Sequence, residues 1–219
     1  MGEGGMIRVI TISREYGSGG ASVARVLTER LRWRLLDNSL ITDLAKQAKV
    51  HPALARRYDE NVDPWFHRLL KALWKGGYEG AASRVESDVF DADAMAALWS
   101  RVIEEAAAIG QCVIVGHGGQ CILQGRNDVF HVSLYAPMGE KLQRIRDRVP
   151  QGTNLAALAE DTDLIRETHI RRYFDRDWRD RSLYHLIIRS SLGVETVADT
   201  ILCAAGLNVA AGIERPTTP

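Results

Sequence analysis

The sequence lacks an excess of charge of either sign. Its 219 residues carry 28 lysines and arginines against 28 aspartates and glutamates, so the formal net charge is zero. A protein that binds bulk nucleic acid or an anionic membrane through charge alone needs a basic surplus, and both classes of partner are therefore excluded. A local cluster of basic residues is still compatible with this balance.

Cysteine is also scarce, and long apolar runs are missing. Cys112, Cys121 and Cys203 are scattered and form no CxxC pair, so neither a zinc site nor a disulfide framework is expected. The first five residues, Met-Gly-Glu-Gly-Gly, do not have the charged-then-apolar layout of a signal peptide, and no apolar run approaches the roughly 20 residues of a membrane span. These absences lead us to expect a cytoplasmic protein without a membrane partner.

Short apolar runs alternate with segments of helical periodicity. Strands are expected where β-branched and apolar residues cluster, at residues 7–12, 34–36, 112–116, 129–134 and 186–188. The stretch 39–110 is expected to be helical with breaks, and individual helices are expected at residues 21–33, 91–109, 140–148, 153–172 and 194–205. This alternation indicates an α/β fold with a mostly parallel sheet covered on both faces. Residues 213–219 are expected to form a loose tail.

A glycine-rich turn joins the first expected strand to the first expected helix. Backbone N–H groups at a helix N-terminus bind anions because they lack partners and lie at the positive end of the helix dipole. Glycine lets the backbone close around a phosphate, and Ser22 puts a hydroxyl in the first helical turn, where a phosphate-binding loop places a magnesium ligand. The residues expected to bind a nucleotide here are Gly17, Ser18, Gly19, Gly20, Ala21 and Ser22.

Two nucleotide-binding interpretations of this turn compete, and a turn without a ligand is a third. Gly17-x-Gly19-x-x-Ser22 nearly matches the dinucleotide fingerprint, with Asp37 at a plausible distance for a ribose contact. In that fingerprint the first glycine follows the strand almost at once, whereas here residues 13–16 intervene. This is the loop length that a P-loop needs to wrap a phosphate, so the P-loop interpretation is favoured.

The same segment resembles the opening of the cytidylate-kinase-like family, which are P-loop kinases of the nucleoside-monophosphate type. The likeness is carried by ITISREYGSGGASVARVLTERLRWRLLDNSLI and continues through CVIVGHGGQCIL, VFHVSLYAP and DWRDRSLYHLIIRSSLGVETV, from residue 7 to about 202. The resemblance implies a three-layer P-loop NTPase fold with a five-stranded sheet, as a single domain over residues 1–212. It also implies a helical acceptor-binding insertion at about 38–110, an arginine-rich lid at about 150–182, and the use of ATP with Mg²⁺.

The loop departs from the family pattern at two positions. A working P-loop has lysine after its last glycine, but this sequence has Gly20 there, and it has Arg14 where the first glycine normally lies. Arginine is always protonated and forks well onto phosphate oxygens, so Arg14 is a candidate to supply the missing charge from the other side of the loop. The alternative is that Arg14 extends into solvent.

On the acceptor side, the resemblance implies roles for Asp37 and His117. Asp37 falls where cytidylate kinases carry an acid after the second strand, and Gly116-His117-Gly118 falls where they carry Gly-Arg-Asp. Because histidine is only partly charged near neutral pH, the grip on an acceptor phosphate or a cytosine is expected to be weaker or different. A lone histidine at a strand end can equally be structural.

The only dense arginine region lies between residues 163 and 181. Arginines on a closing lid commonly neutralise a transferring phosphoryl group and exclude water, and the resemblance places the lid here. The expected catalytic arginines are Arg14, Arg166, Arg172 and Arg176, with Arg144 and Arg148 as weaker candidates. The competing interpretation is an exposed helix laced with surface ion pairs, each of little energetic value.

These observations favour a nucleotide-binding phosphotransferase that moves the γ-phosphate of ATP to a nucleoside monophosphate of the CMP type or to another small acceptor. The missing lysine keeps open a second function, that of a nucleotide-binding or regulatory protein without catalysis. A nicotinamide-dependent oxidoreductase is a third, although no proton-relay residues stand out for it. A homodimer also stays open, because an apolar helical stripe packs either internally or against a second copy; it consists of Trp65, Phe66, Leu69, Leu70, Leu73 and Trp74.

Overall fold

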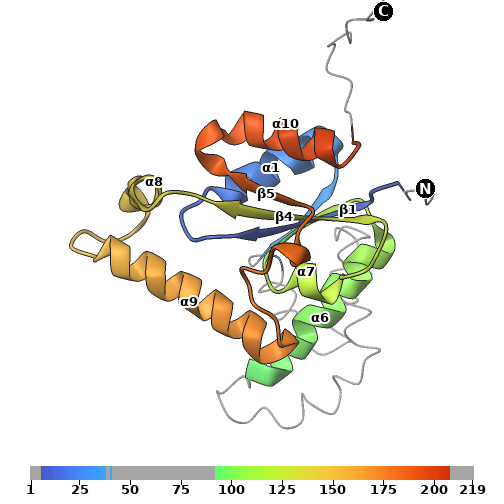
Figure 1. The fold of residues 1–219 in the computed structure, drawn as a ribbon, viewed down its shortest axis with the longest axis horizontal. Coiled ribbons are helices and arrows are strands. Elements are labelled where there is room, and N and C mark those ends of the chain that lie inside the picture. The colour runs from blue at the N-terminus through green and yellow to red at the C-terminus, as the bar shows by residue number, and fades with distance from the viewer. Residues whose placement is uncertain (1–5, 38–39, 41–91, 208–219) are drawn as a thin grey trace, which may run out of the picture.

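One five-stranded sheet forms the centre of the protein (Figure 1). The computed structural model describes residues 6–37, 40 and 92–207. The strands lie in the order β2-β3-β1-β4-β5, and all of the pairings are parallel. Their bounds are β1 (Val9–Arg14), β2 (Arg34–Leu36), β3 (Cys112–Val115), β4 (Val129–Tyr135) and β5 (Leu186–Arg189).

Helices cover both faces of this sheet. Their bounds are α1 (Gly20–Leu31), α6 (Ala92–Ile109), α7 (Gly119–Ile122), α8 (Met138–Ile145), α9 (Leu155–Phe174) and α10 (Val194–Ala204). Helices α1 and α10 pack together on one face, and α6 and α7 lie on the other (Figure 1). The predicted three-layer α/β fold is thereby confirmed. No described helix is long and apolar enough to cross a bilayer.

The central strand β1 shows how the sequence builds the two cores. Successive side chains of a strand point to opposite faces, and Ile10 and Ile12 are fully buried against α1 and α10, whereas Val9 is buried on the side of α6. Thr11 and Ser13 share the face of Val9 and are also buried. The α6 side of the sheet therefore changes from apolar to polar toward the carboxyl end of β1, where the glycine-rich turn begins.

The predicted elements agree with the observed ones to within two residues, with two exceptions. The helix expected over residues 140–148 is α-helical only to Ile145 and continues as a 3-10 turn over residues 146–148. The four-residue α7 was not predicted, because a single turn is too short to show helical periodicity. The expected strand over 7–12 runs instead from 9 to 14, because Ser13 and Arg14 continue to pair with β4.

Several predictions lie outside the described residues. Of the helical insertion expected at 38–110, the structure describes α6 and Leu40. Residues 41–91, which contain the apolar stripe from Trp65 to Trp74, and the tail at 213–219 fall outside the described part of the chain.

Candidate active site

The turn between β1 and α1 is tightly packed at one glycine and open at another. Gly17 and Gly19 have φ angles of 74° and 84°, the left-handed region that favours glycine. A Cβ atom on Gly17 would lie 3.0 Å from the carbonyl oxygen of Lys141, so the glycine lets α8 approach the loop. A Cβ atom on Gly19 would have no neighbour within 4 Å. The open side of the loop therefore lies beside the start of α1, where the backbone N–H groups of Ser22 and Val23 donate to the carbonyl oxygen of Gly19.

Arg14 ends β1 and runs across the start of α1 toward the end of β3. A Cβ atom built on Gly20 would lie 2.9 Å from Cγ of Arg14, and one built on Gly116 would lie 1.8 Å from its Nη1. The side chain is half-buried and lines a pocket instead of extending into open solvent. Burial and then the positive charge of Arg166 lower the pKa of Arg14 to about 10, against the opposing influence of nearby carboxylates. Arg14 is therefore a desolvated cation at the phosphate loop.

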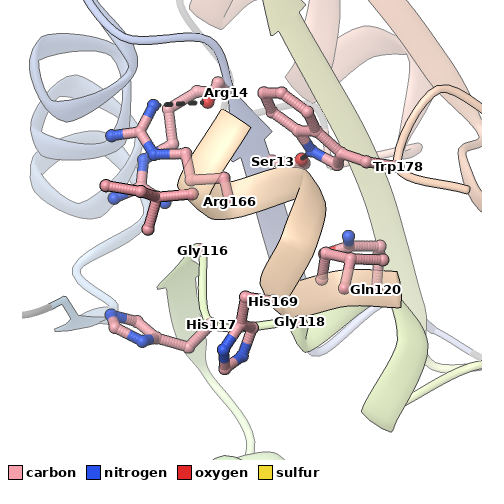
Figure 2. A pocket seen from close by; sticks show the side chains of 11 residues that line it. Ser13, Arg14, Gly116, His117, Gly118, Gln120, Arg166, His169 and Trp178 are labelled. Carbon is pink, nitrogen blue, oxygen red and sulfur yellow. Dashed lines mark hydrogen bonds between the residues drawn. The ribbon is translucent and has the colours of Figure 1, made fainter. Parts of the chain in front are cut away.

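Helix α9 is fastened to the loop by Asp163 and Arg166. The backbone N–H of Tyr16 donates a hydrogen bond to Oδ1 of Asp163 (2.6 Å). Nη1 of Arg166 donates to the carbonyl oxygen of Arg14 (2.9 Å), as Figure 2 shows. Arg166 also pairs with Oδ1 of Asp163 at 3.2 Å, one helical step away. Burial lowers the pKa of Arg166, and Asp163 acts in the opposite direction. The Asp163–Arg166 pair thus faces the loop.

Lys141 of α8 adds a cation that the sequence analysis did not single out. Its Nζ lies 2.8 Å from Oε2 of Glu15 and 3.0 Å from Oδ2 of Asp163, and only 7% of the side chain is exposed. Burial by itself lowers the pKa of Lys141, but the hydrogen bonds to the two carboxylates leave the pKa raised. The backbone N–H of Ala136 donates to the same Glu15 oxygen at 3.2 Å. The loop is therefore bound to α8 and α9 through one charged cluster.

A pocket of about 320 Å³ opens between the strand ends and α9 (Figure 2). Two arginines form its charged wall, and on another side Nε1 of Trp178 donates to Oγ of Ser13 at 2.6 Å. Gln120 of α7 is buried and lines the same space. The lining consists of Ser13, Arg14, Gly116, His117, Gly118, Gln120, Ile165, Arg166, His169, Ile170 and Trp178.

His117 lies in this pocket as a neutral ring. It stacks on Trp99 of α6 with ring centroids 3.2 Å apart and an interplanar angle of 7°. Burial, followed by the charges of Arg14, His169 and Arg166, lowers the pKa of His117 to about 3. At physiological pH the ring therefore offers a hydrogen bond and carries no charge.

Gly118 leaves room for an aromatic side chain of α9. A Cβ atom at this position would lie 2.3 Å from Cε2 of Phe174. The aspartate that cytidylate kinases are expected to carry here has no space, because Phe174 occupies it.

The other predicted site residues do not line the pocket. Asp37 follows β2, and its carboxylate accepts a hydrogen bond from the backbone N–H of Leu40 at 3.2 Å. Arg172 lines a separate groove between α9 and α6, and Arg176, beyond the end of α9, is exposed. Arg144, a weaker candidate, donates from Nη1 to the carbonyl oxygen of Gly17 at 3.4 Å. The structure thus brings together Arg14, Arg166 and His117, and places Arg172 and Arg176 outside that group.

The strand order decides between the two nucleotide-binding interpretations. In the dinucleotide-binding fold, β2 lies directly beside β1, so that an acid after β2 can reach the ribose. Here β3 lies between β1 and β2, and Asp37 is separated from the glycine-rich turn by a whole strand.

Comparison with known proteins agrees with this architecture. The model of the cytidylate kinase-like family matches residues 9–192. The chain belongs to this family. Membership supports a nucleotide-binding phosphotransferase. No curated protein matches the chain.

Solved structures share the fold at low sequence identity. One is an uncharacterized protein from Eubacterium ventriosum, with a TM-score of 0.62 and 19% identity over 91% of this chain and 99% of that chain. Another is shikimate kinase from Acinetobacter baumannii in complex with shikimate, with a TM-score of 0.50 and 19% identity over 90% of this chain and 91% of that chain. Both likenesses place this member of the cytidylate kinase-like family among proteins of the same architecture.

Proposed function

We propose that this protein transfers the γ-phosphate of ATP to a small anionic acceptor, either a nucleoside monophosphate of the CMP type or another small molecule. The observation that carries the proposal is the convergence of Arg14 and Arg166 on one pocket beside the phosphate loop. The two come from different elements, and the charge of Arg166 lowers the pKa of Arg14. Two cations held near each other in a partly desolvated site are stabilised when an anion binds between them.

The donor phosphates bind at the loop and the start of α1. Gly17, Ser18, Gly19, Gly20, Ala21 and Ser22 form this segment, and the open side of Gly19 gives the phosphates access. The Ser/Thr position of the P-loop pattern is Ala21 in this chain, and Ser22 places a hydroxyl one residue later in the first turn of α1, where it would be the protein ligand of Mg²⁺. Magnesium usually takes only one or two protein ligands and completes its shell with water and phosphate oxygens, so this donor set fits. When bound, the ion neutralises charge on the β- and γ-phosphates.

The acceptor binds in the pocket, where Arg14 faces the terminal phosphates of the donor and Arg166 stabilises the transferring group. Neutral His117 and the amide of Gln120 supply hydrogen bonds. A monophosphate acceptor is already an anion, so no catalytic base is needed, and the reaction depends on positioning and charge neutralisation. Arg172 and Arg176 lie outside this pocket, and the proposed chemistry does not use them.

Phosphorus NMR tests this function directly. The protein is mixed with Mg·ATP and with CMP, UMP, AMP, GMP and dCMP, and with shikimate as a carboxylate-bearing alcohol. We expect a new phosphorylated product that matches one acceptor. The variant Arg166→Met should transfer phosphate about 100-fold more slowly or worse, because it removes one preorganised charge from the site. Arg146→Met is the matched control, because Arg146 is an exposed residue of the 3-10 turn after α8.

Two results of this experiment would contradict the proposed function. If ATP stays intact, or if only ADP and free phosphate form, transfer to these acceptors is refuted, and the nucleotide-binding function without catalysis is favoured. If Arg166→Met and Arg146→Met transfer phosphate at the same rate, the pocket is not the site of transfer.

A further inference from the structure

The positions of Arg14 and Gly20 are the reverse of the usual arrangement in a phosphate loop. The P-loop pattern G-x-x-x-x-G-K-[ST] begins with glycine and has lysine after its last glycine. When the pattern is aligned with its first glycine at residue 14, this chain has arginine at residue 14, glycine at residues 19 and 20, and alanine at residue 21 in place of the serine or threonine. One cation is missing from the end of the loop, and one has been added at its beginning.

The structure gives a steric reason for glycine at residue 20. Gly20 is the first residue of α1 and is not among the residues with positive φ, so its backbone does not require glycine. Its Cβ position is instead occupied by Arg14, with Cγ at 2.9 Å and Cβ at 3.0 Å. These atoms lie near the backbone of Arg14, where the side chain has little freedom to move aside. Any larger residue at 20 therefore collides with the stem of Arg14.

Gly116 accommodates the other end of the same side chain. A Cβ atom there would lie 1.8 Å from Nη1 of Arg14. The stem thus passes Gly20 and the guanidinium reaches Gly116 at the end of β3. In the described part of the chain the guanidinium makes no hydrogen bond or ion pair with a carboxylate, and its desolvation is only partly offset by Asp37 and Asp163. This charge is available to a ligand.

We propose that Arg14 and Gly20 have exchanged roles, so that the cation for the terminal phosphates of a nucleoside triphosphate enters the loop from its first residue. The inference rests on the proposed function and deepens it. Gly20 is glycine because Arg14 crosses the space of the usual lysine side chain. The guanidinium can bind phosphate oxygens with two parallel N–H donors, which a lysine cannot. The loop is therefore rearranged and keeps its positive charge.

The steric part is tested by a double-mutant cycle on stability, without nucleotide. Thermal unfolding is measured for the wild type, Gly20→Ala, Arg14→Gly and the double variant, because alanine at position 14 would keep the Cβ atom that lies 3.0 Å from the Cβ position of residue 20. Alanine is normally the better helix former, so Gly20→Ala should raise the melting temperature when Arg14 has been removed. With Arg14 present, the same change should lower it. Equal shifts in both backgrounds would overturn the steric argument, because non-contacting residues show additive effects.

The electrostatic part is tested by the affinity for Mg·ATP, measured by calorimetry. Arg14→Ala should weaken binding by roughly 10- to 100-fold, the loss expected for a hydrogen bond to a charged group. The double variant Arg14→Gly/Gly20→Lys, which restores the usual pattern, should bind more tightly than Arg14→Ala. Arg25→Ala, at an exposed position of α1, is the control for loss of a positive charge near the loop and should bind as the wild type does.

The outcomes separate this inference from the function on which it rests. If the wild type binds Mg·ATP and Arg14→Ala binds it equally well, the exchange is refuted and the proposed function stands. If the wild type does not bind Mg·ATP at all, the proposed function and the exchange both fail, whatever the stability cycle shows.

Discussion

Replacing Asp163 by asparagine should loosen the attachment of α9 to the phosphate loop. The carboxylate accepts a hydrogen bond from the backbone N–H of Tyr16 through Oδ1 and pairs with Lys141 through Oδ2. Asparagine is nearly the same size and can keep its carbonyl oxygen toward Tyr16. It then turns an uncharged NH₂ group toward the ammonium of Lys141. The substitution therefore removes the charge while it leaves the volume unchanged.

The size of the effect follows from the burial of the pair. The side chains of Lys141 and Asp163 are 7% and 14% exposed, and removing one partner of a buried ion pair costs about 3–5 kcal/mol. Lys141 retains Glu15 at 2.8 Å, so we expect a smaller loss, about 2–3 kcal/mol of unfolding free energy. For a chain of this length each kcal/mol lowers the melting temperature by about 2–4 °C, which gives a decrease of about 4–12 °C.

Urea unfolding and thermal unfolding at neutral pH measure this loss. The matched control is Asp161→Asn, the same substitution two residues earlier on α9 at an exposed position, which should change the unfolding free energy by no more than about 0.5 kcal/mol. A second control, Lys141→Met, removes the other member of the pair. If Asp163→Asn and Asp161→Asn unfold alike, the charged cluster does not hold the loop and the reasoning is refuted.

Two further predictions concern packing and acid stability. Gly118→Ala should cost about 1–3 kcal/mol more unfolding free energy than Gly125→Ala, because both residues have positive φ but only the first would collide with Phe174; equal losses in urea titrations would contradict this. Acid should weaken the fold below pH 6.5, because burial, followed by the charge of His185, lowers the pKa of His131 from 6.5 to about 4. Between these values the unfolded chain binds a proton that the folded chain does not, so the unfolding free energy falls by about 1.4 kcal/mol per pH unit from this group. In the His131→Asn variant, the unfolding free energy should fall less steeply with decreasing pH, by about 1.4 kcal/mol per pH unit. If this pH dependence is the same as in the wild type, His131 is not the group responsible.

The sequence predicts the elements of this fold well because each one has a local signal. The apolar runs of β1 and β3, the glycine-rich turn and the periodicity of α9 all lie within short windows. The phosphate loop follows from the same local information, since a strand, a turn and a helix start are consecutive. Asp163 and Arg166 were also predictable as a pair, because residues three apart on a helix face the same side.

The contacts between distant segments could not be predicted in this way. Lys141 lies at an ordinary position of a polar helix, and its burial arises only because α9 crosses over it and brings Asp163 within 3.0 Å. The neutral state of His117 depends on Trp99, which comes from another helix. The space at Gly20 is filled by Arg14 only because the loop returns the start of α1 to the end of β1. Each of these contacts joins segments that are far apart in the sequence or belong to different elements, so a pattern within one short window does not predict it.

Helix α9 links the glycine-rich loop mechanically to Gly118 at the edge of the pocket. Asp163 and Arg166, near the middle of α9, contact the loop. Phe174, the last residue of α9, fills the space beside Gly118. Between Asp163 and Phe174 the helix contains neither glycine nor proline, so this stretch of about 16 Å has no built-in hinge. A displacement of α9 that breaks the Asp163–Tyr16 hydrogen bond must therefore also shift Phe174 away from Gly118, which lines the pocket. The glycine-rich loop and the Gly118 side of the pocket are consequently coupled through one rigid helix.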